Sequence, residues 1–297
     1  MNKDLLNLQP NFRFMSEEEI NAMLAEVVKS AIKAVEGRWS NDRGRRMVYA
    51  NLDGGLCDSL LRVSLMVSEV NTKEIDEARE RGEITKAAQV WLHFHELLVN
   101  RKLSLPGLIK DIAEKYRVYP GIFKTYGHLL SQGVGVATVT NATKMFLEAA
   151  IGAHPHLRGF PAPLFANDLI FEAGDFWGLK VAASSEEMIA KGDIVRRAYE
   201  LHGVLPVGCI GDGRSDIGMA EAMLEINSAG IIVACGIHSP LAEWCRENKL
   251  KAVEPGTPNP QGNYMVVSGA GFTPDVRKTL SSLVSHETPR AKKKSAA

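Results

Sequence analysis

Apolar segments alternate with amphipathic helical segments from residue 133 to residue 234, and this alternation restricts the possible folds more than any other feature. The expected strands are 133–139, 164–172, 179–183, 207–210 and 230–234, and the expected helices are 144–153, 193–202 and 217–224. Strands that alternate with helices form a mainly parallel sheet through crossover connections. The predicted fold is therefore α/β, a mainly parallel Rossmann-like sheet flanked by helices.

One further strand precedes this region, and a long helical segment separates the two. Residues 46–52 form a mainly apolar run that stops at Asp53-Gly54-Gly55, whereas residues 60–124 have helical periodicity. We expect the helical segment to be a cap domain that is inserted after the first strand. The predicted organisation is an α/β core of residues 46–59 and 125–253 with a helical cap of residues 60–124.

The two ends of the chain are predicted to be extensions of this core. Residues 1–45 contain Ser16 and Glu19 at capping-box spacing before an amphipathic run, so they predict an N-terminal helical extension. The apolar face of that helix must pack on its own core or on a second copy, and we expect a monomer or a homodimer. Residues 254–297 are predicted to be a C-terminal extension with a disordered basic tail.

The charge balance excludes some classes of partner. Lys and Arg total 35, and Asp and Glu also total 35, so the net field gives no reason to expect a nucleic acid or a membrane as partner. The first twenty residues do not resemble a signal peptide, and no apolar run is long enough to cross a bilayer. We therefore expect a cytoplasmic protein.

The cysteine and histidine patterns do not predict a metal centre. Four cysteines occur without any CxxC pair, which predicts reduced and mostly buried thiols, and these are Cys57, Cys209, Cys235 and Cys245. Two histidine pairs also lack acidic or cysteine neighbours at helical spacing, so we expect no ligand role for His93, His95, His154 and His156.

Polar residues follow the expected strands, and the most informative of them follow the strand 207–210. There, Gly211-Asp212-Gly213 places a carboxylate on a tight turn, and Asp216 comes one helical turn later. Two carboxylates near a strand end are suited to Mg²⁺, which prefers oxygen ligands. The alternative is that Asp212 and Asp216 only shape the turn and cap the next helix.

Other strand-end residues are suited to bind a phosphate group. Gly54 and Gly55 leave backbone N–H groups open to an anion, and Thr140 with Asn141 adds donors beyond another strand. Lys191, on a loop, would place a positive charge near a transferred phosphoryl group, although a loop lysine is more often simply solvated. These segments together predict a site for a small phosphorylated metabolite.

The order of these segments resembles the four motifs of the haloacid dehalogenase superfamily, over residues 46–248. That family begins with Asp-x-Asp-Gly-Thr, where this chain has Asn51-Leu52-Asp53-Gly54-Gly55. Thr140-Asn141 resembles the second motif, Lys191 the third, and Gly211-Asp212-Gly213-x-x-Asp216 the fourth. The helical cap and the stretch 166–178 are similar to the phosphoserine phosphatase-like branch.

The resemblance implies a Mg²⁺-dependent phosphomonoester hydrolase that acts through an aspartyl-phosphate. It assigns the catalytic positions to Asn51 as the nucleophile position, Asp53, Thr140 and Lys191. It assigns substrate binding to Gly54, Gly55, Asn141 and Arg62. It assigns the metal ligands to Asn51, Asp53, Asp212 and Asp216, with Asp212 binding directly and Asp216 acting through water or through another ligand.

Position 51 departs from the family. An amide has almost the shape of a carboxylate but is neutral and a very poor nucleophile, so we expect the fold to survive, the covalent step to be lost and Mg²⁺ to bind more weakly. Leu60 stands where phosphoserine phosphatases have a glutamate for the substrate amine, which argues against phosphoserine itself.

Two accounts of Asn51 remain open at this point. In one, the natural protein is a phosphatase with aspartate at this position, and the asparagine was introduced to trap a ligand. In the other, the natural protein has lost phosphatase activity and serves as a phosphate-ligand sensor or a protein-binding module. An unrelated nucleotide-binding protein is a third reading, but no glycine-rich phosphate loop follows the first strand.

Overall fold

The computed structural model describes most of the chain. The described residues are 8–35, 45–52, 64–66, 68–108, 110, 119–153, 164–182, 190–257, 262–268 and 271–282.

Within these residues, eight strands form one sheet in the order β1-β5-β4-β3-β2-β6-β7-β8. The strands are β1 Phe12–Phe14, β2 Arg45–Ala50, β3 Val134–Thr143, β4 Leu164–Glu172, β5 Asp175–Val181, β6 Val204–Gly211, β7 Ile231–Cys235 and β8 Tyr264–Val267. All neighbouring pairs are parallel except β4 and β5, which form an antiparallel hairpin. The predicted α/β class with a mainly parallel sheet is confirmed.

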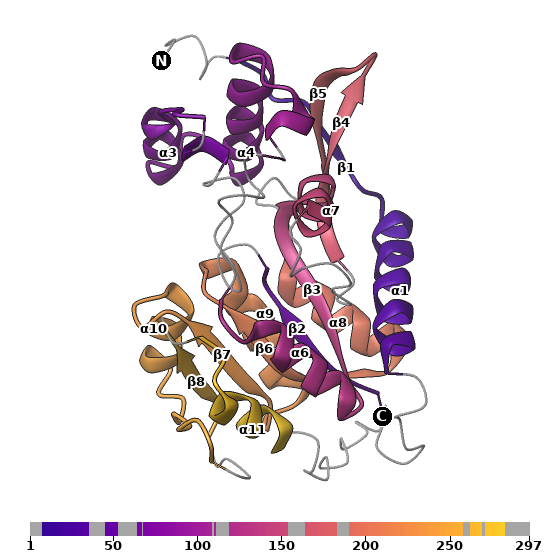
Figure 1. Cartoon of the computed structure of the whole chain (residues 1–297), viewed down its shortest axis with the longest axis vertical. Coiled ribbons are helices and arrows are strands. Elements are labelled where there is room, and N and C mark those ends of the chain that lie inside the picture. The colour runs from indigo at the N-terminus through magenta and orange to yellow at the C-terminus, as the bar shows by residue number, and fades with distance from the viewer. Residues whose placement is uncertain are drawn as a thin grey trace, which may run out of the picture.

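Helices cover both faces of the sheet, because the central strands are apolar on both sides (Figure 1). In β2, Val48 and Ala50 face one hydrophobic cluster and Met47 and Tyr49 face the other, as the alternation of a strand requires. The first cluster is covered by α6 Ile122–Ser131, α7 Lys144–Ala153 and α11 Pro274–Ser282. The second is covered by α1 Glu17–Ala34, α8 Lys191–His202, α9 Arg214–Ile226 and α10 Pro240–Glu247.

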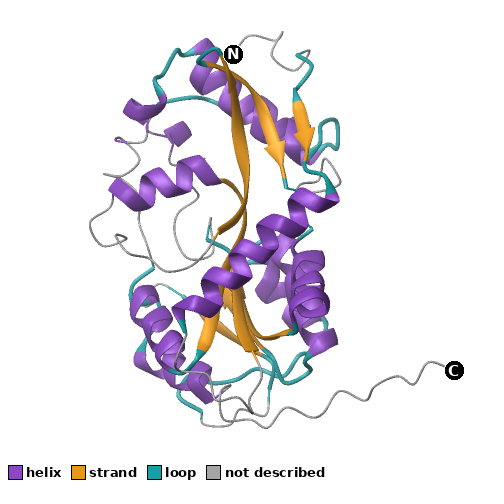
Figure 2. Cartoon of the chain, turned by 90° about the vertical axis from the view of Figure 1, so that its right-hand side faces the viewer, coloured by secondary structure: helices purple, strands orange, loops and turns teal. Residues whose placement is uncertain are grey.

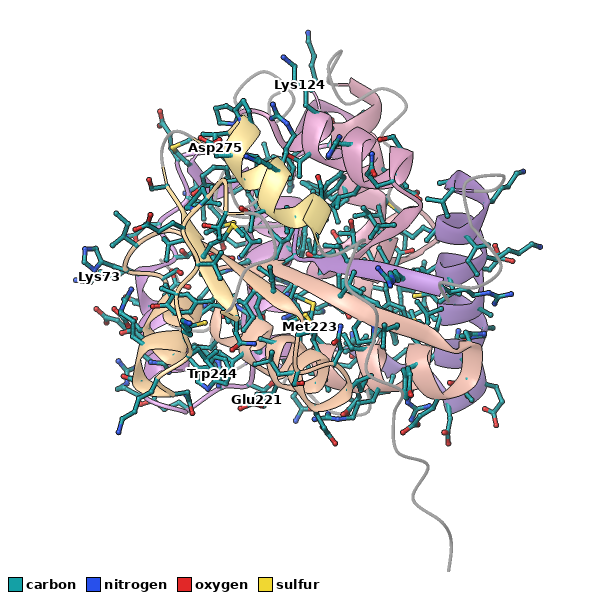
Figure 3. All side chains as sticks on the ribbon, turned by 90° about the horizontal axis from the view of Figure 1, so that it is seen from below. Lys73, Lys124, Glu221, Met223, Trp244 and Asp275 are labelled. Carbon is teal, nitrogen blue, oxygen red and sulfur yellow. The ribbon has the colours of Figure 1, made fainter. Side chains whose placement is uncertain are left out.

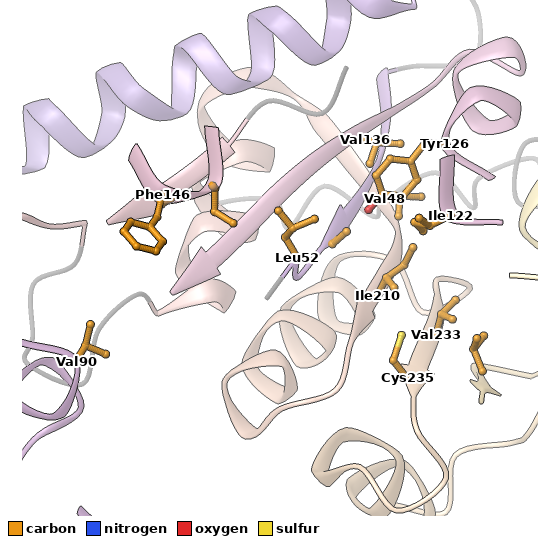
Figure 4. Packing of buried hydrophobic residues seen from close by; sticks show 14 of the residues in the cluster. Val48, Leu52, Val90, Ile122, Tyr126, Val136, Phe146, Ile210, Val233 and Cys235 are labelled. Atoms are coloured by element: carbon orange, nitrogen blue, oxygen red, sulfur yellow. The ribbon is translucent and has the colours of Figure 1, made fainter. Parts of the chain in front are cut away.

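The first cluster is formed by side chains from several strands. Figure 4 shows Val48, Val136, Ile210 and Val233 of neighbouring strands, with Tyr126 of α6 close to Val48 and Val136. Many side chains, among them the labelled Lys73, Lys124 and Asp275, lie at the periphery of the molecule (Figure 3). This packing holds the carboxyl ends of β2, β3 and β6 side by side.

The segment predicted to be a cap forms helices at one end of the molecule (Figure 1). It contains α3 Lys73–Glu80, α4 Lys86–His95 and the π-helix η2 Glu96–Asn100. The β4–β5 hairpin extends from the sheet toward these helices, and Trp91 of α4 lies 6.1 Å from Phe176 of β5 between ring centroids (Figures 1 and 2). Phe94 makes an edge contact with Phe146 of α7 at 5.5 Å. Aromatic packing therefore joins α4 to β5 and α7.

Both predicted extensions contribute to the sheet. The N-terminal segment supplies β1, which pairs with β5, and the segment after residue 254 supplies β8, which pairs with β7. The helix predicted after Ser16 is α1, and its capping box is present because Ser16 and Glu19 exchange side-chain to backbone hydrogen bonds. No helix in the described ranges is long and apolar enough to cross a bilayer.

Candidate functional site

Asn51 continues the line of β2 by one residue. Its backbone N–H donates to the carbonyl of Ile210 on β6 at 2.7 Å, so the strand pairing extends to this position. The residue is only 5% exposed. The sheet therefore fixes Asn51 at the carboxyl ends of two central strands, where ligands bind in folds of this type.

Asp216 is fully buried in the first turn of α9, and each of its carboxylate oxygens accepts hydrogen bonds. Oδ2 accepts from the backbone N–H groups of Asp212 at 2.8 Å and Gly213 at 2.9 Å. A Cβ atom on Gly211 would lie 2.4 Å from this Oδ2, so no side chain fits there. The turn thus uses glycine to bring backbone donors onto a buried anion.

Lys191 is the first residue of α8 and does not lie on a loop as predicted. Its side chain is 1% exposed, and Nζ donates to Oδ1 of Asp216 at 2.5 Å. Helices α8 and α9 approach closely at this point, since a Cβ atom on Gly192 would lie 2.5 Å from the carbonyl oxygen of Gly218. The loop placement was wrong, and the alternative of a solvated lysine does not hold either, because this close approach buries Lys191 against its counter-ion.

The amide of Asn51 completes the cluster. Its Nδ2 donates to Oδ1 of Asp212 and to Oδ2 of Asp216, each at 3.3 Å. Asn51, Lys191, Asp212 and Asp216 therefore converge, as the order of the motifs predicts.

Thr140 and Asn141 lie within β3, whereas the sequence places them after the strand. The pairing of β3 with β4 is irregular between Val139 and Thr143, so both residues lie in a local distortion of the strand. Thr140 is fully buried, and its Oγ1 accepts a hydrogen bond from the N–H of Ala142 at 3.2 Å. Thr140 lies two residues beyond the pair Ala50–Thr138 and hence on the strand beside Asn51.

Asn167 is a supporting residue to which the sequence gave no role. It is fully buried, its Nδ2 donates to the carbonyl of Asn141 at 2.9 Å, and its Oδ1 accepts from the N–H of Ala182 at 2.9 Å. The amide thereby ties the distorted end of β3 to the chain after β5. An asparagine within an apolar strand is the only sequence signal for this role.

Four predicted site residues lie outside the described residues, and these are Asp53, Gly54, Gly55 and Arg62. Their assigned roles stay predictions.

The residues as arranged do not make a magnesium site. Mg²⁺ needs oxygen ligands directed at one point, but the group directed at both carboxylates is the NH₂ of Asn51, and Lys191 and two backbone N–H groups also donate to Asp216. Among the described residues, no three His, Cys, Asp or Glu side chains are grouped to hold a metal ion.

The cysteines near the site are not nucleophiles. Cys209, Cys235 and Cys245 are free and buried, as predicted, and Cys57 lies outside the described residues. Burial raises the pKa of the Cys209 thiol well above its ordinary value, and the nearby Asp216 carboxylate raises it further. A thiolate is therefore disfavoured beside the site.

No family model matches the sequence, and no curated protein sequence matches it. The fold nevertheless matches solved structures. A substrate-bound phosphoserine phosphatase matches with a TM-score of 0.51 and 19% identity, over 68% of this chain and 91% of that chain. A probable phosphoserine phosphatase from Vibrio cholerae, in unliganded form, matches with a TM-score of 0.53 and 17% identity, over 86% of this chain and 68% of that chain. The chain therefore has the fold of these two phosphoserine phosphatase structures.

Proposed function

We propose that the cluster at the carboxyl ends of β2 and β6 is a phosphomonoester hydrolase site whose covalent step is disabled in this chain by Asn51. One observation carries the proposal: Asn51 ends β2 and hydrogen-bonds to Asp212 and to Asp216, which is paired with the buried Lys191. A carboxylate at this position would attack the phosphorus atom and displace an alcohol, and water would then release phosphate from the acyl-phosphate. An amide cannot perform this attack.

The remaining roles belong to the same proposal. Asp53 would protonate the leaving oxygen and later activate water, and the backbone N–H groups of Gly54 and Gly55 would bind phosphoryl oxygens. Thr140, Asn141 and Lys191 would hold the other phosphoryl oxygens, and Arg62 would contact the leaving group. We further propose that the ligand is a small phosphorylated metabolite, that the chain is a monomer or a homodimer, and that turnover by the Asn51→Asp variant requires Mg²⁺.

A second candidate function is binding of a phosphorylated ligand without turnover, as in a sensor or a protein-binding module. A specific observation favours it. The Asn51 amide donates to both carboxylates, so an asparagine side chain fits this site and finds acceptors for its NH₂ group. The two candidates share the same site and differ in whether the natural protein catalyses hydrolysis.

The test compares the chain with Asn51→Asp and Asn51→Ala on a broad panel of phosphomonoesters in Mg²⁺. We expect phosphate release from the Asn51→Asp variant and none from the other two, because the alanine controls for the mere loss of the amide. If no variant turns over but calorimetry detects a phosphorylated ligand bound to the chain, the second candidate is favoured. Absence of both turnover and ligand binding would overturn the assignment of the site.

A further inference from the structure

The amide of Asn51 lies between two acidic groups. Its Nδ2 is 3.3 Å from Oδ1 of Asp212 and 3.3 Å from Oδ2 of Asp216. Asp216 is fully buried, and Asn51 is 5% exposed. The two N–H bonds of one neutral group are therefore directed at two carboxylates, in the place where a bridging cation would otherwise bring them together.

The charges of the cluster explain why a bridging donor is needed. Lys191 donates to Oδ1 of Asp216, whereas the Asn51 amide donates to Oδ2 of the same carboxylate. Asp212 and Asp216 would repel each other across the turn if no donor lay between them. Buried carboxylates need hydrogen-bond donors or cations, and the Asn51 amide meets that need.

Replacement of this amide by a carboxylate would reverse the interaction. An aspartate at position 51 has the same shape, so its oxygen atoms would lie near 3.3 Å from Asp212 and Asp216 with no hydrogen to donate. Three carboxylates would then lie together beside Lys191. Such a group keeps its geometry only with a divalent cation or a bound proton.

We propose that the Asn51 amide takes the place of the divalent cation, so that this chain holds its site assembled without metal. The proposal rests on the proposed function only in identifying these residues as the phosphatase-type site. It implies that Mg²⁺ does not increase the stability of this chain. It also implies that the single change Asn51→Asp converts a metal-independent site into one whose stability depends on metal.

The experiment measures thermal unfolding in EDTA and in millimolar Mg²⁺, with no phosphate compound present. We expect the chain to unfold at the same temperature in both buffers. We expect Asn51→Asp to unfold at least about 5 °C lower than the chain in EDTA and to recover most of this loss in Mg²⁺.

Asn100→Asp is the matched control, because Nδ2 of Asn100 donates to Oε2 of Glu96 at 2.6 Å in the cap. This variant makes the same chemical change beside another carboxylate, and we expect a small loss of stability that Mg²⁺ does not reverse.

Two results would overturn the inference. One is that Mg²⁺ raises the unfolding temperature of the chain as much as it raises that of Asn51→Asp, and the other is that Asn51→Asp is as stable as the chain in EDTA. If Asn51→Asp does not fold, titration calorimetry of Mg²⁺ into the chain decides, since binding at micromolar affinity would contradict the proposal. A metal-dependent Asn51→Asp variant that hydrolyses no phosphomonoester would support this inference while the proposed function fails.

Discussion

Lys191→Met would remove the cation that faces the Asp216 carboxylate inside the protein. The two side chains are 1% and 0% exposed, and Nζ lies 2.5 Å from Oδ1. Loss of one partner from a buried ion pair costs about 3–5 kcal/mol, because the other charge stays buried. Asp216 would keep the backbone N–H groups of Asp212 and Gly213 at the start of α9, which favour an anion. We therefore expect the lower end of this range, about 3 kcal/mol.

The assay is thermal unfolding of the chain and the variant in EDTA. At roughly 2 °C per kcal/mol for a chain of this size, Lys191→Met should unfold about 6 °C lower. The matched control is Lys73→Met, which breaks the exposed pair with Glu77 at 3.5 Å, where the side chains are 76% and 45% exposed. That change should cost about 0.5 kcal/mol or less.

The double variant Lys191→Met, Asp216→Asn separates the lost attraction from the uncompensated charge. It removes both charges, so it should be more stable than the sum of the two single changes predicts. The reasoning would be refuted if Lys191→Met changed stability no more than Lys73→Met does, because solvent would then have to reach Asp216.

Three further changes test the packing and the cap. Gly192→Ala should destabilise the chain by about 3 kcal/mol in urea unfolding, since its Cβ would lie 2.5 Å from the carbonyl oxygen of Gly218. Gly127→Ala should stabilise it by about 0.5–1 kcal/mol, since this α6 position is open and alanine favours helix. Loss of stability there would show that α6 is packed differently. Proximity to His93 lowers the pKa of Asp76 to about 2, so Asp76 stabilises the cap above its unfolded pKa of 3.8 and loses this effect as the pH falls toward 2. Asp76→Asn should lower the free energy of unfolding by about 1 kcal/mol at neutral pH, a value reduced because the Asp76 side chain is half-exposed. It should also flatten the acid side of a curve of stability against pH.

The local elements of the core could be predicted well from the sequence. The helix at 144–153 and the strand at 164–172 have the bounds of α7 and β4, because long apolar runs between turn residues define them. The sequence predicted two separate strands at 164–172 and 179–183 but not the hairpin that β4 and β5 form. Ala173 and Gly174 have φ values of 51° and 94°, which is the geometry of a two-residue hairpin turn. Glu172 and Asp175 on either side of this turn pair with each other.

The edge strands could not be predicted from local pattern. β1 has three residues and β8 has four, and such short runs carry little periodicity. Phe12 pairs with Leu179, which is far away in the chain, so only the folded sheet reveals the partner. The predicted extensions therefore proved to contain strands whose pairing depends on tertiary structure.

The approach of Asn51 to Asp212 and Asp216 could be predicted from the sequence, but their hydrogen bonds could not. The rule that ligands bind at the carboxyl ends of parallel strands brings Asn51 and Asp212 together, because β2 and β6 are neighbours. The burial of Lys191 was not predictable, since it depends on the approach of α8 to α9 at Gly192. The direction of the Asn51 amide was likewise not predictable, because a side chain that can donate or accept is oriented by its neighbours.

Glycines hold this cluster in place as much as its charges do. Gly211 leaves room for the Asp216 carboxylate, and Gly192 lets α8 carry Lys191 against it, so both positions fix the geometry through backbone contacts. An exchange of amide for carboxylate at position 51 changes neither contact and scarcely changes volume. The packing around position 51 therefore leaves room for either side chain, whereas the ability to attack phosphorus and the charge balance of the cluster both depend on one functional group.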